Sequence, residues 1–225
     1  MGKRKQLEEM LTNPFDGLTE EKIQEQCDEI AEELFCHHCI NCNGKKYYFA
    51  EIEFYYWDNT HWNKNWNRMT YPRKSKAMKL FFHLSGIDIC FESDYDPNNL
   101  DNEAKFGGIL IRTIRSEDGI TAGPWNCMLK IMNDCQDKQM PQIEYLGKNC
   151  NSKDNIAKTY RCLGKDDMES EREIATRKEN PLNLHYYDSK VFADNVIKQE
   201  KIKLGKRDGA LRKSPSVYKL FKLNK

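Results

Sequence analysis

The chain has 225 residues, of which 39% are hydrophobic and 32% charged, and its formal net charge is +1. This length and composition suit a single domain with a hydrophobic core and a well-solvated surface. No apolar run reaches the length of a membrane-spanning helix, which excludes an integral helical membrane protein. The basic start at 1–6 lacks the apolar segment of a secretion signal and the Ser or Thr of a myristoylation motif. We therefore expect an intracellular protein that does not bind a membrane.

The near-neutral total hides an uneven charge distribution. From Lys198 to Lys225, ten lysines and arginines stand against only Glu200 and Asp208, so the rest of the chain is acidic. A basic end on an acidic body indicates either a localised contact with a polyanion or simply a solvated tail.

The chain contains nine cysteines, and their odd number and irregular spacing favour reduced, partly buried thiols over a disulfide framework. The densest group, CHHCINC at 36–42, contains two C-x-x-C steps that share Cys39. Cys36, Cys39 and Cys42 are therefore candidate zinc ligands. No second ligand pair of similar spacing follows, and the alternative is that these cysteines pack in the interior.

The first predicted elements are a polar leader at 1–15 and a helix. Thr19, followed by two glutamates, is typical of a helix start. The helix is expected to end near Cys36, and four apolar residues at helical spacing form its buried stripe: Ile23, Cys27, Ile30 and Leu34.

Strands are predicted next, at 46–57, 80–84, 87–91 and 108–114. The second and third form a hairpin that turns at Ser85-Gly86. Alternation in the first places Tyr48, Ala50, Ile52 and Phe54 on one face, and Phe49, Glu51, Glu53 and Tyr55 on the other.

Gly123-Pro124 predicts the start of a second helix, because proline is tolerated in the first turn. Its expected buried side is Met128, Leu129 and Met132. Residues 134–180 are polar and predict a long excursion with a short helix. Strand-like patterns return at 191–204 and 217–223.

Glu51 and Glu53 are the most informative local feature. Two residues apart on a strand they share a face, with Cα atoms roughly 6.5–7 Å apart. Burial and a like charge both disfavour ionised carboxylates, so such a pair indicates either a functional site or a strand whose glutamates face water. Arg112, inside an apolar strand, is the natural counter-charge; the alternative is an edge-strand arginine that reaches solvent.

A loop at 57–68 interleaves three tryptophans with asparagines and basic residues. Exposed tryptophan beside arginine and asparagine is typical of surfaces that stack on nucleobases. The equally open alternative is a lid of tryptophan side chains folded over the core. YPRK at 71–74 adds positive charge suited to phosphates.

Six short motifs follow one another in a recognisable order. They are AEIEFY at 50–55 with His61, YPRK at 71–74, LFFHLSG at 80–86, GILIRTI at 108–114, GPWNCML at 123–129 and IKLGK at 202–206. This order resembles the alkylpurine (3-methyladenine) DNA glycosylase family. The family patterns are E-x-E-A-Y…H…T-P-R-N, Y-V-Y-x-x-Y-G, G-x-x-L-L-R-A, G-P-G-K-L and R-I-G-I-G.

The resemblance implies one α+β domain at 16–225, with a curved, mostly antiparallel, open-barrel-like sheet and peripheral helices. It implies DNA base excision repair, in which a monofunctional enzyme flips a damaged purine out of double-stranded DNA and hydrolyses its N-glycosidic bond. The chemistry needs no metal or other cofactor, and we expect a monomer. A non-catalytic module on the same scaffold, binding nucleic acid or a modified base, is the alternative.

Family positions also imply residue roles. Glu53 corresponds to the general base that activates water, which Arg112 and the backbone carbonyl of Ile202 help to hold; Glu51 supports Glu53. An aromatic enclosure suits electron-poor alkylated purines. The residues implied to bind the flipped base are Tyr55, His61, Phe82 and Glu92. Those implied to contact DNA are Arg73, Lys74, His83 and Ser85.

Three of these positions depart from the family. Ser85 stands where the family has an intercalating tyrosine, and a serine is too small to fill the gap that a flipped base leaves. His83 or Phe81 is the candidate substitute. Glu92 replaces a gating asparagine, and Phe82 replaces a tyrosine, keeping a stacking face without the hydroxyl.

Overall fold

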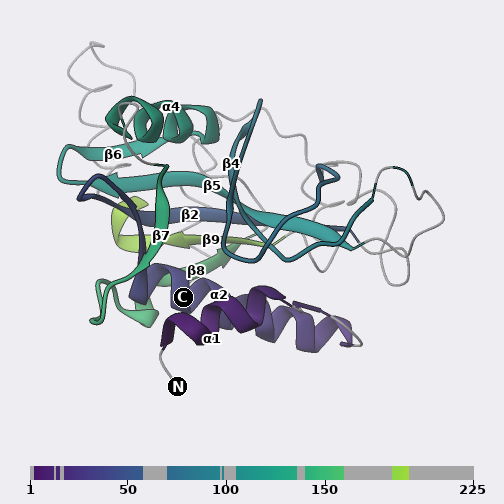
Figure 1. The fold of residues 1–225 in the computed structure, drawn as a ribbon. Coiled ribbons are helices and arrows are strands. Elements are labelled where there is room, and N and C mark those ends of the chain that lie inside the picture. The colour runs from purple at the N-terminus through teal and green to yellow at the C-terminus, as the bar shows by residue number, and fades with distance from the viewer. Residues whose placement is uncertain are drawn as a thin grey trace, which may run out of the picture.

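The computed structural model describes residues 3–12, 14–15, 18–57, 70–96, 98, 105–135, 140–159 and 184–192. These form an α+β domain built on a curved antiparallel sheet that resembles half a barrel, with a few helices packed around it (Figure 1). The predicted fold class is confirmed. No helix in this part of the chain is both long enough and apolar enough to cross a bilayer.

Two long strands form the centre of the sheet. β2 (Lys45–Trp57) and β5 (Phe106–Ser116) pair antiparallel along nearly their whole length. The outer edge of β2 is shared by β1 and β9, and that of β5 by β4 and β6. The bounds are β1 His38–Cys42, β3 Leu80–His83, β4 Gly86–Cys90, β6 Gly119–Ala122, β7 Gln142–Tyr145, β8 Ile156–Thr159 and β9 His185–Asp188.

The strands outside these extend the sheet on both sides. β3 pairs with β4, β7 with β1 and β8 with β9, all antiparallel. β1 and β9 pair with different parts of β2, so residues from distant parts of the chain meet beside this strand.

Helix α2 (Glu20–His37) agrees with the sequence prediction. The Thr19 hydroxyl accepts a hydrogen bond from the Lys22 amide at 3.5 Å and caps the helix. All four residues of the predicted stripe are buried in the hydrophobic core: Ile23, Cys27, Ile30 and Leu34. The helix ends one residue later than predicted, where β1 begins.

The predicted leader at 1–15 is wrong for most of its length. Residues Lys3–Thr12 form helix α1, and Leu7 and Leu11 are fully buried in the core together with Phe15. The backbone carbonyl of Leu11 also accepts from the Glu92 amide at 2.8 Å. The helix looks polar in sequence because few of its residues are apolar. Leu7 and Leu11, four residues apart, nevertheless lie on one face, and that face packs into the core.

Helix α4 (Pro124–Cys135) starts where predicted, but its buried side differs. Met128 is buried as expected, whereas Leu129 and Met132 are 39% and 52% exposed. The remaining buried positions are Cys127, Ile131 and Cys135, spaced four residues apart. Cysteines occupy two of these three positions, so a pattern based on large apolar residues points to the wrong side.

Residues 134–180 contain more sheet than predicted. β7, a short 3-10 helix (Lys153–Asn155) and β8 lie there, while 136–139 and 160–183 are outside the described residues. Of the predicted strand at 191–204, only Val191 and Phe192 are described, and they are helical. The predicted strand at 217–223 lies outside the described residues.

The β3–β4 hairpin turns at Leu84-Ser85, one residue before the predicted position, because His83 pairs with Gly86. Gly86 has φ +149° and is buried against the start of α4. A Cβ there would lie 2.7 Å from the Cβ of Pro124. The close approach of α4 therefore requires glycine at this position.

Candidate active site on the polar face of the sheet

One face of the sheet carries a row of mostly polar side chains. Along it, Glu53 on β2 lies opposite both His185 on β9 and Leu110 on β5. Leu110 lies opposite Asp88 on β4, which lies opposite Phe81 on β3. Directly opposed residues in antiparallel strands share a face. We call this row, with the residues beside it, the polar face.

The other face of the same strands belongs to the core. The residues that alternate with the row are all buried in the hydrophobic cluster: Ile52, Ile87, Ile89, Ile109 and Ile111. The register thus separates an apolar face from a polar one, and both are shielded from solvent.

Irregularities in the β2–β5 pairing determine which side chains reach the polar face. Pairing skips Ala50 between Phe49 and Glu51, and it skips Arg112 between Glu51 and Ile52. The first irregularity reverses the alternation, so Phe49 joins the core instead of the face of Glu51 as predicted. The second leaves Arg112 as an extra residue, and its side chain reaches both glutamates.

Glu53 is held on both of its carboxylate oxygens. The Arg112 Nη1 donates to Oε2 at 2.7 Å, and the His185 Nε2 lies 2.5 Å from Oε1. Glu53 is 1% exposed and His185 is fully buried. The predicted partnership of Glu53 and Arg112 is therefore present, with His185 as a third member.

Glu51 shares the same arginine. Its Oε1 lies 3.5 Å from the Arg112 Nε, and its Oε2 accepts from the Thr113 hydroxyl at 2.9 Å. Both glutamates are buried, so the alternative of a strand with water-facing glutamates does not apply. One guanidinium thus contacts two buried carboxylates, which explains why an arginine is placed in an apolar strand.

The environment keeps the Glu53 carboxyl ionised. Burial by itself raises the pKa of this carboxyl. His185, Arg112 and a hydrogen bond from Tyr55 lower it by more than burial raises it, so the pKa falls from 4.5 to about 2. Buried charge compensated by specific partners is typical of functional sites.

A second charged cluster lies two strands away on the same face, roughly 10 Å from Glu53 across the sheet. Arg73 Nη2 lies 2.9 Å from Asp88 Oδ2 and also donates to the Gly107 carbonyl at 2.8 Å. The His83 Nδ1 accepts from the Ser85 amide, so its Nε2 donates to Asp88 Oδ1 at 3.1 Å. The Arg73 guanidinium also covers the Phe81 ring at 4.5 Å.

Two of the predicted DNA contacts, Arg73 and His83, belong to this second cluster. Arg73 is buried, and its side chain crosses Gly108, where a Cβ would lie 2.3 Å from its Nη2. His83 is held by Asp88 and packs against the Tyr71 ring at 4.7 Å. Both side chains therefore organise the polar face from inside, and Lys74 and Ser85 are the exposed members of the predicted DNA-contacting set.

At the hairpin tip the exposed apolar residue is Leu84, which is 87% exposed. The neighbouring Ser85 hydroxyl lies 3.2 Å from the Tyr71 hydroxyl. Tyr71 is itself partly exposed, so an aromatic ring from the preceding segment lies beside Ser85.

The predicted base-binding residues are not all brought together. Tyr55 lies on the polar face and bonds to Glu53, but Phe82 lies opposite Ile87 and packs against the core. Phe81 is the ring of β3 on the polar face. Glu92 forms an ion pair with exposed Lys76. His61, Ile202 and residues 58–68 of the tryptophan loop predicted at 57–68 lie outside the described residues. Trp57 itself is the last residue of β2, and its ring stacks on that of Phe106 at 5.6 Å.

His185 is the residue that sequence reasoning missed. The run Leu-His-Tyr-Tyr at 184–187 is bounded by polar residues and is rich in aromatics, which is typical of a short strand. That signal was present, although no local pattern indicates that β9 pairs with β2 beside Glu53.

The zinc prediction at 36–42 is not supported. Cys42 is bonded to Cys135, which also corrects the expectation of reduced thiols throughout. Burial raises the pKa of Cys36 to about 11 and of Cys39 to about 12. Within the described residues, no group of three or more His, Cys, Asp or Glu is arranged to hold a metal ion.

Two surface hollows are lined by described residues, one of about 470 Å³ between α1 and α2 and one of about 260 Å³ beside β7. Neither is lined by Glu53. No family model, curated protein or solved structure matches the chain.

Proposed function

We propose that this protein is a hydrolase of N-glycosidic bonds and, more narrowly, a monofunctional DNA glycosylase that excises alkylated or deaminated purines. The observation that carries the proposal is the buried Glu53 carboxylate, ionised and oriented by Arg112 and His185. The order of the sequence motifs around these residues supports the same assignment.

The chemistry follows from the charge on Glu53. Glycosidic cleavage passes through an oxocarbenium-like state, and a fixed carboxylate stabilises the positive charge that develops on the sugar. The carboxylate has about four lone-pair positions, and Arg112, His185 and Tyr55 use three of them, so one position remains from which Glu53 can accept a proton from an attacking water. Water, rather than a lysine, is the nucleophile in this proposal, so excision leaves the DNA backbone intact.

The proposed substrate is a damaged purine in double-stranded DNA, bound by an intracellular monomer. Exposed Lys74 and the exposed tip at Leu84 and Ser85 are the described groups suited to a duplex. An apolar side chain at a hairpin tip suits insertion between base steps, which Ser85 is too small to do. Because Glu53 is 1% exposed, a flipped base reaches it only after the covering part of the chain moves.

A non-catalytic module that binds nucleic acid or a modified base is the second candidate. The specific observation in its favour is that both oxygens of Glu53 already have protein partners. In that case the Arg112–Glu53–His185 group would stabilise the polar face and take no part in chemistry.

Replacing Glu53, the proposed general base, distinguishes the two candidate functions. We expect Glu53→Gln to abolish release of hypoxanthine, ethenoadenine or 3-methyladenine from duplexes, because the amide neither carries charge nor accepts a proton as readily. Binding of the same duplexes, measured by fluorescence anisotropy, should change by less than about threefold. Glu32→Gln, at an exposed pair with Lys153, is the matched control.

Each outcome decides between the candidates. Release by the wild type and by Glu32→Gln, but not by Glu53→Gln, supports the glycosylase. Equal release by Glu53→Gln removes Glu53 from the mechanism. Tight binding of damaged duplexes by the wild type without release of any base, before or after alkali, favours the module.

A further inference from the structure

Helix α4 is fixed at its C-terminal end by sulfur. Its last residue, Cys135, forms a disulfide with Cys42, the last residue of β1, across a sequence separation of 93 residues and a Cα–Cα distance of 5.4 Å. The Asn43 side-chain amide donates to the Cys135 carbonyl at 2.7 Å. The end of the helix is therefore joined to the β1–β2 hairpin by a covalent bond and a hydrogen bond.

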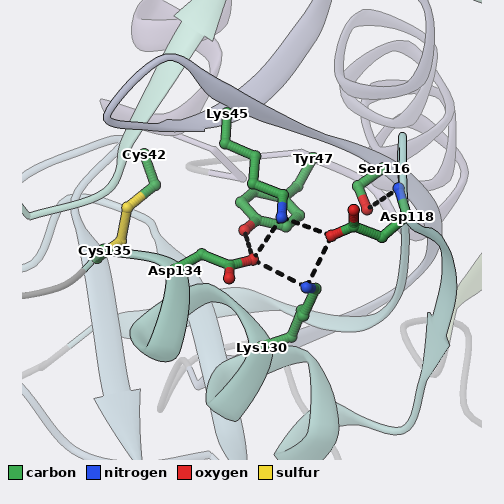
Figure 2. A network of polar contacts seen from close by, with 8 residues as sticks. All are labelled: Cys42, Lys45, Tyr47, Ser116, Asp118, Lys130, Asp134 and Cys135. Atoms are coloured by element: carbon green, nitrogen blue, oxygen red, sulfur yellow. Dashed lines mark hydrogen bonds and ion pairs between the residues drawn. A yellow bond between two sulfur atoms is a disulfide. The ribbon is translucent and has the colours of Figure 1, made fainter.

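A charge network fixes the same half of the helix (Figure 2). Lys130 lies 2.8 Å from Asp118 and 3.0 Å from Asp134, and Lys45 lies 3.0 Å from Asp134 and also pairs with Asp118. The Tyr47 hydroxyl donates to Asp134. Single exposed ion pairs contribute little, but this network joins α4 both to β2 and to the β5–β6 turn.

The other end of α4 touches the active-site arginine. The backbone carbonyl of Arg112 accepts from the Gly123 amide at 2.8 Å and from the Cys127 thiol at 3.4 Å. Arg112 is the extra residue of the β5 irregularity and has no Cα partner on β2, although Ile111 and Thr113 on either side of it do. Gly123, directly before α4, and Cys127, in the first turn of α4, contact the Arg112 backbone at this unpaired position.

We propose that the Cys42–Cys135 disulfide is a reversible redox clamp that sets the position of Arg112 through α4. The helix has 12 residues and is roughly 18 Å long, short enough to act as a rigid rod. Fixing its C-terminal end then limits how its first turn rocks against Arg112. The inference rests on the proposed function for its effect on activity, although the clamp itself does not.

The chemical step is thiol–disulfide exchange with a low-molecular-weight thiol. A thiolate attacks the Cys135 sulfur, because Cys135 is 8% exposed and Cys42 is 1% exposed, and Cys42 leaves as a thiolate that takes up a proton. A second thiolate attacks the mixed disulfide and releases the Cys135 thiol. Two small thiols are thereby oxidised to one disulfide, and a small-molecule disulfide reverses both steps.

The first test requires no activity. Purified full-length protein is equilibrated with oxidised glutathione or with dithiothreitol, alkylated under native and denaturing conditions, and mapped by mass spectrometry. We expect reduction to add one alkyl group to Cys42 and one to Cys135, and to change the alkylation of no other pair of cysteines. The clamp is overturned if Cys42 and Cys135 are alkylated to the same extent after treatment with oxidised glutathione as after treatment with dithiothreitol.

The second test reads the link to Arg112 by hydrogen exchange. Reduction should speed exchange of the Gly123 amide by at least about tenfold, because this amide donates to the Arg112 carbonyl. The Cys42→Ser/Cys135→Ser double variant should match the reduced protein in either buffer, whereas the matched control Cys150→Ser should respond as the wild type does. If the exchange rate of the Gly123 amide does not change on reduction, the proposed coupling between the disulfide and Arg112 is refuted.

The third test uses base excision, if Glu53-dependent release is observed. Reduction should lower kcat by at least about threefold and leave KM nearly unchanged, since it displaces a group near the reacting bond rather than the DNA-binding surface. An equal kcat in both states refutes the functional part of the clamp. Redox-dependent alkylation and exchange without any excision leave the clamp standing and refute the glycosylase.

Discussion

Two opposing effects act on the carboxyl of Glu53. Its burial favours the neutral form and raises its pKa, while His185 and Arg112 favour the anion. The partners prevail, and the pKa falls to about 2. An anion buried in this way attracts positive charge strongly, because little solvent screens it.

This lowered pKa predicts how stability depends on pH. The Glu53 carboxyl titrates near 4.5 when unperturbed and near 2 in the fold, so its stabilising interactions are complete above about pH 4.5 and are lost as the pH falls towards 2. The difference in unfolding free energy between wild type and Glu53→Gln should be constant from pH 7 to 5 and then shrink. Urea denaturation at several pH values measures it, and a difference that does not vary with pH would contradict this assignment.

Arg112 should be the most sensitive residue of the site for stability. Arg112→Met leaves two buried carboxylates without their shared cation and is expected to cost about 3–5 kcal/mol of unfolding free energy. Arg115→Met, which removes only a contact 5.2 Å above the Tyr48 ring, should cost less than about 1 kcal/mol. Urea denaturation of both variants gives the comparison, and equal losses would show that Glu51 and Glu53 do not depend on Arg112.

Among the elements, β3 separates two adjacent aromatic residues. Phe82 packs against the core, whereas Phe81 faces the polar side beneath Arg73. The family resemblance assigns the base-binding role to position 82, but the register with β4 gives the polar face to position 81.

The two phenylalanines should therefore respond differently to truncation. Phe82→Ala should lower the unfolding free energy by about 2–4 kcal/mol, because it opens a cavity in the core. Phe81→Ala should cost less stability and weaken binding of damaged duplexes, since it removes a ring from the proposed base-binding face. Thermal denaturation and anisotropy measured on both variants test the assignment, and the reverse pattern would return the role to Phe82.

At the scale of the whole molecule, α1 belongs to the core. Leu11→Ala should lower the unfolding free energy by about 2–5 kcal/mol, because the Leu11 side chain of α1 is fully buried in the hydrophobic core. The exposed neighbour Glu8 is the control, and Glu8→Ala should change stability by less than about 0.5 kcal/mol. If both variants melt like the wild type, α1 does not contribute to the stability of the domain.

Local sequence determined the elements whose periodicity is long and regular. The stripe of α2, its Thr19 cap, the long strands β2 and β5 and the start of α4 at Gly123-Pro124 all follow from spacing and from residues that favour one backbone geometry. The Glu53–Arg112 partnership was also predictable, because a buried arginine in an apolar strand needs a carboxylate.

Only the tertiary structure decided which distant segments meet. The skipped pairing at Ala50 moves Phe49 to the core, β9 brings His185 to Glu53, and α4 brings Cys135 to Cys42. Register, irregularities in pairing and strand order depend on how whole elements pack, and a one-residue shift exchanges the two faces of a strand. Local patterns do not determine those choices, so the sequence indicated the chemistry of Glu53 and its pairing with Arg112, but not that His185 would join them or that Cys135 would meet Cys42.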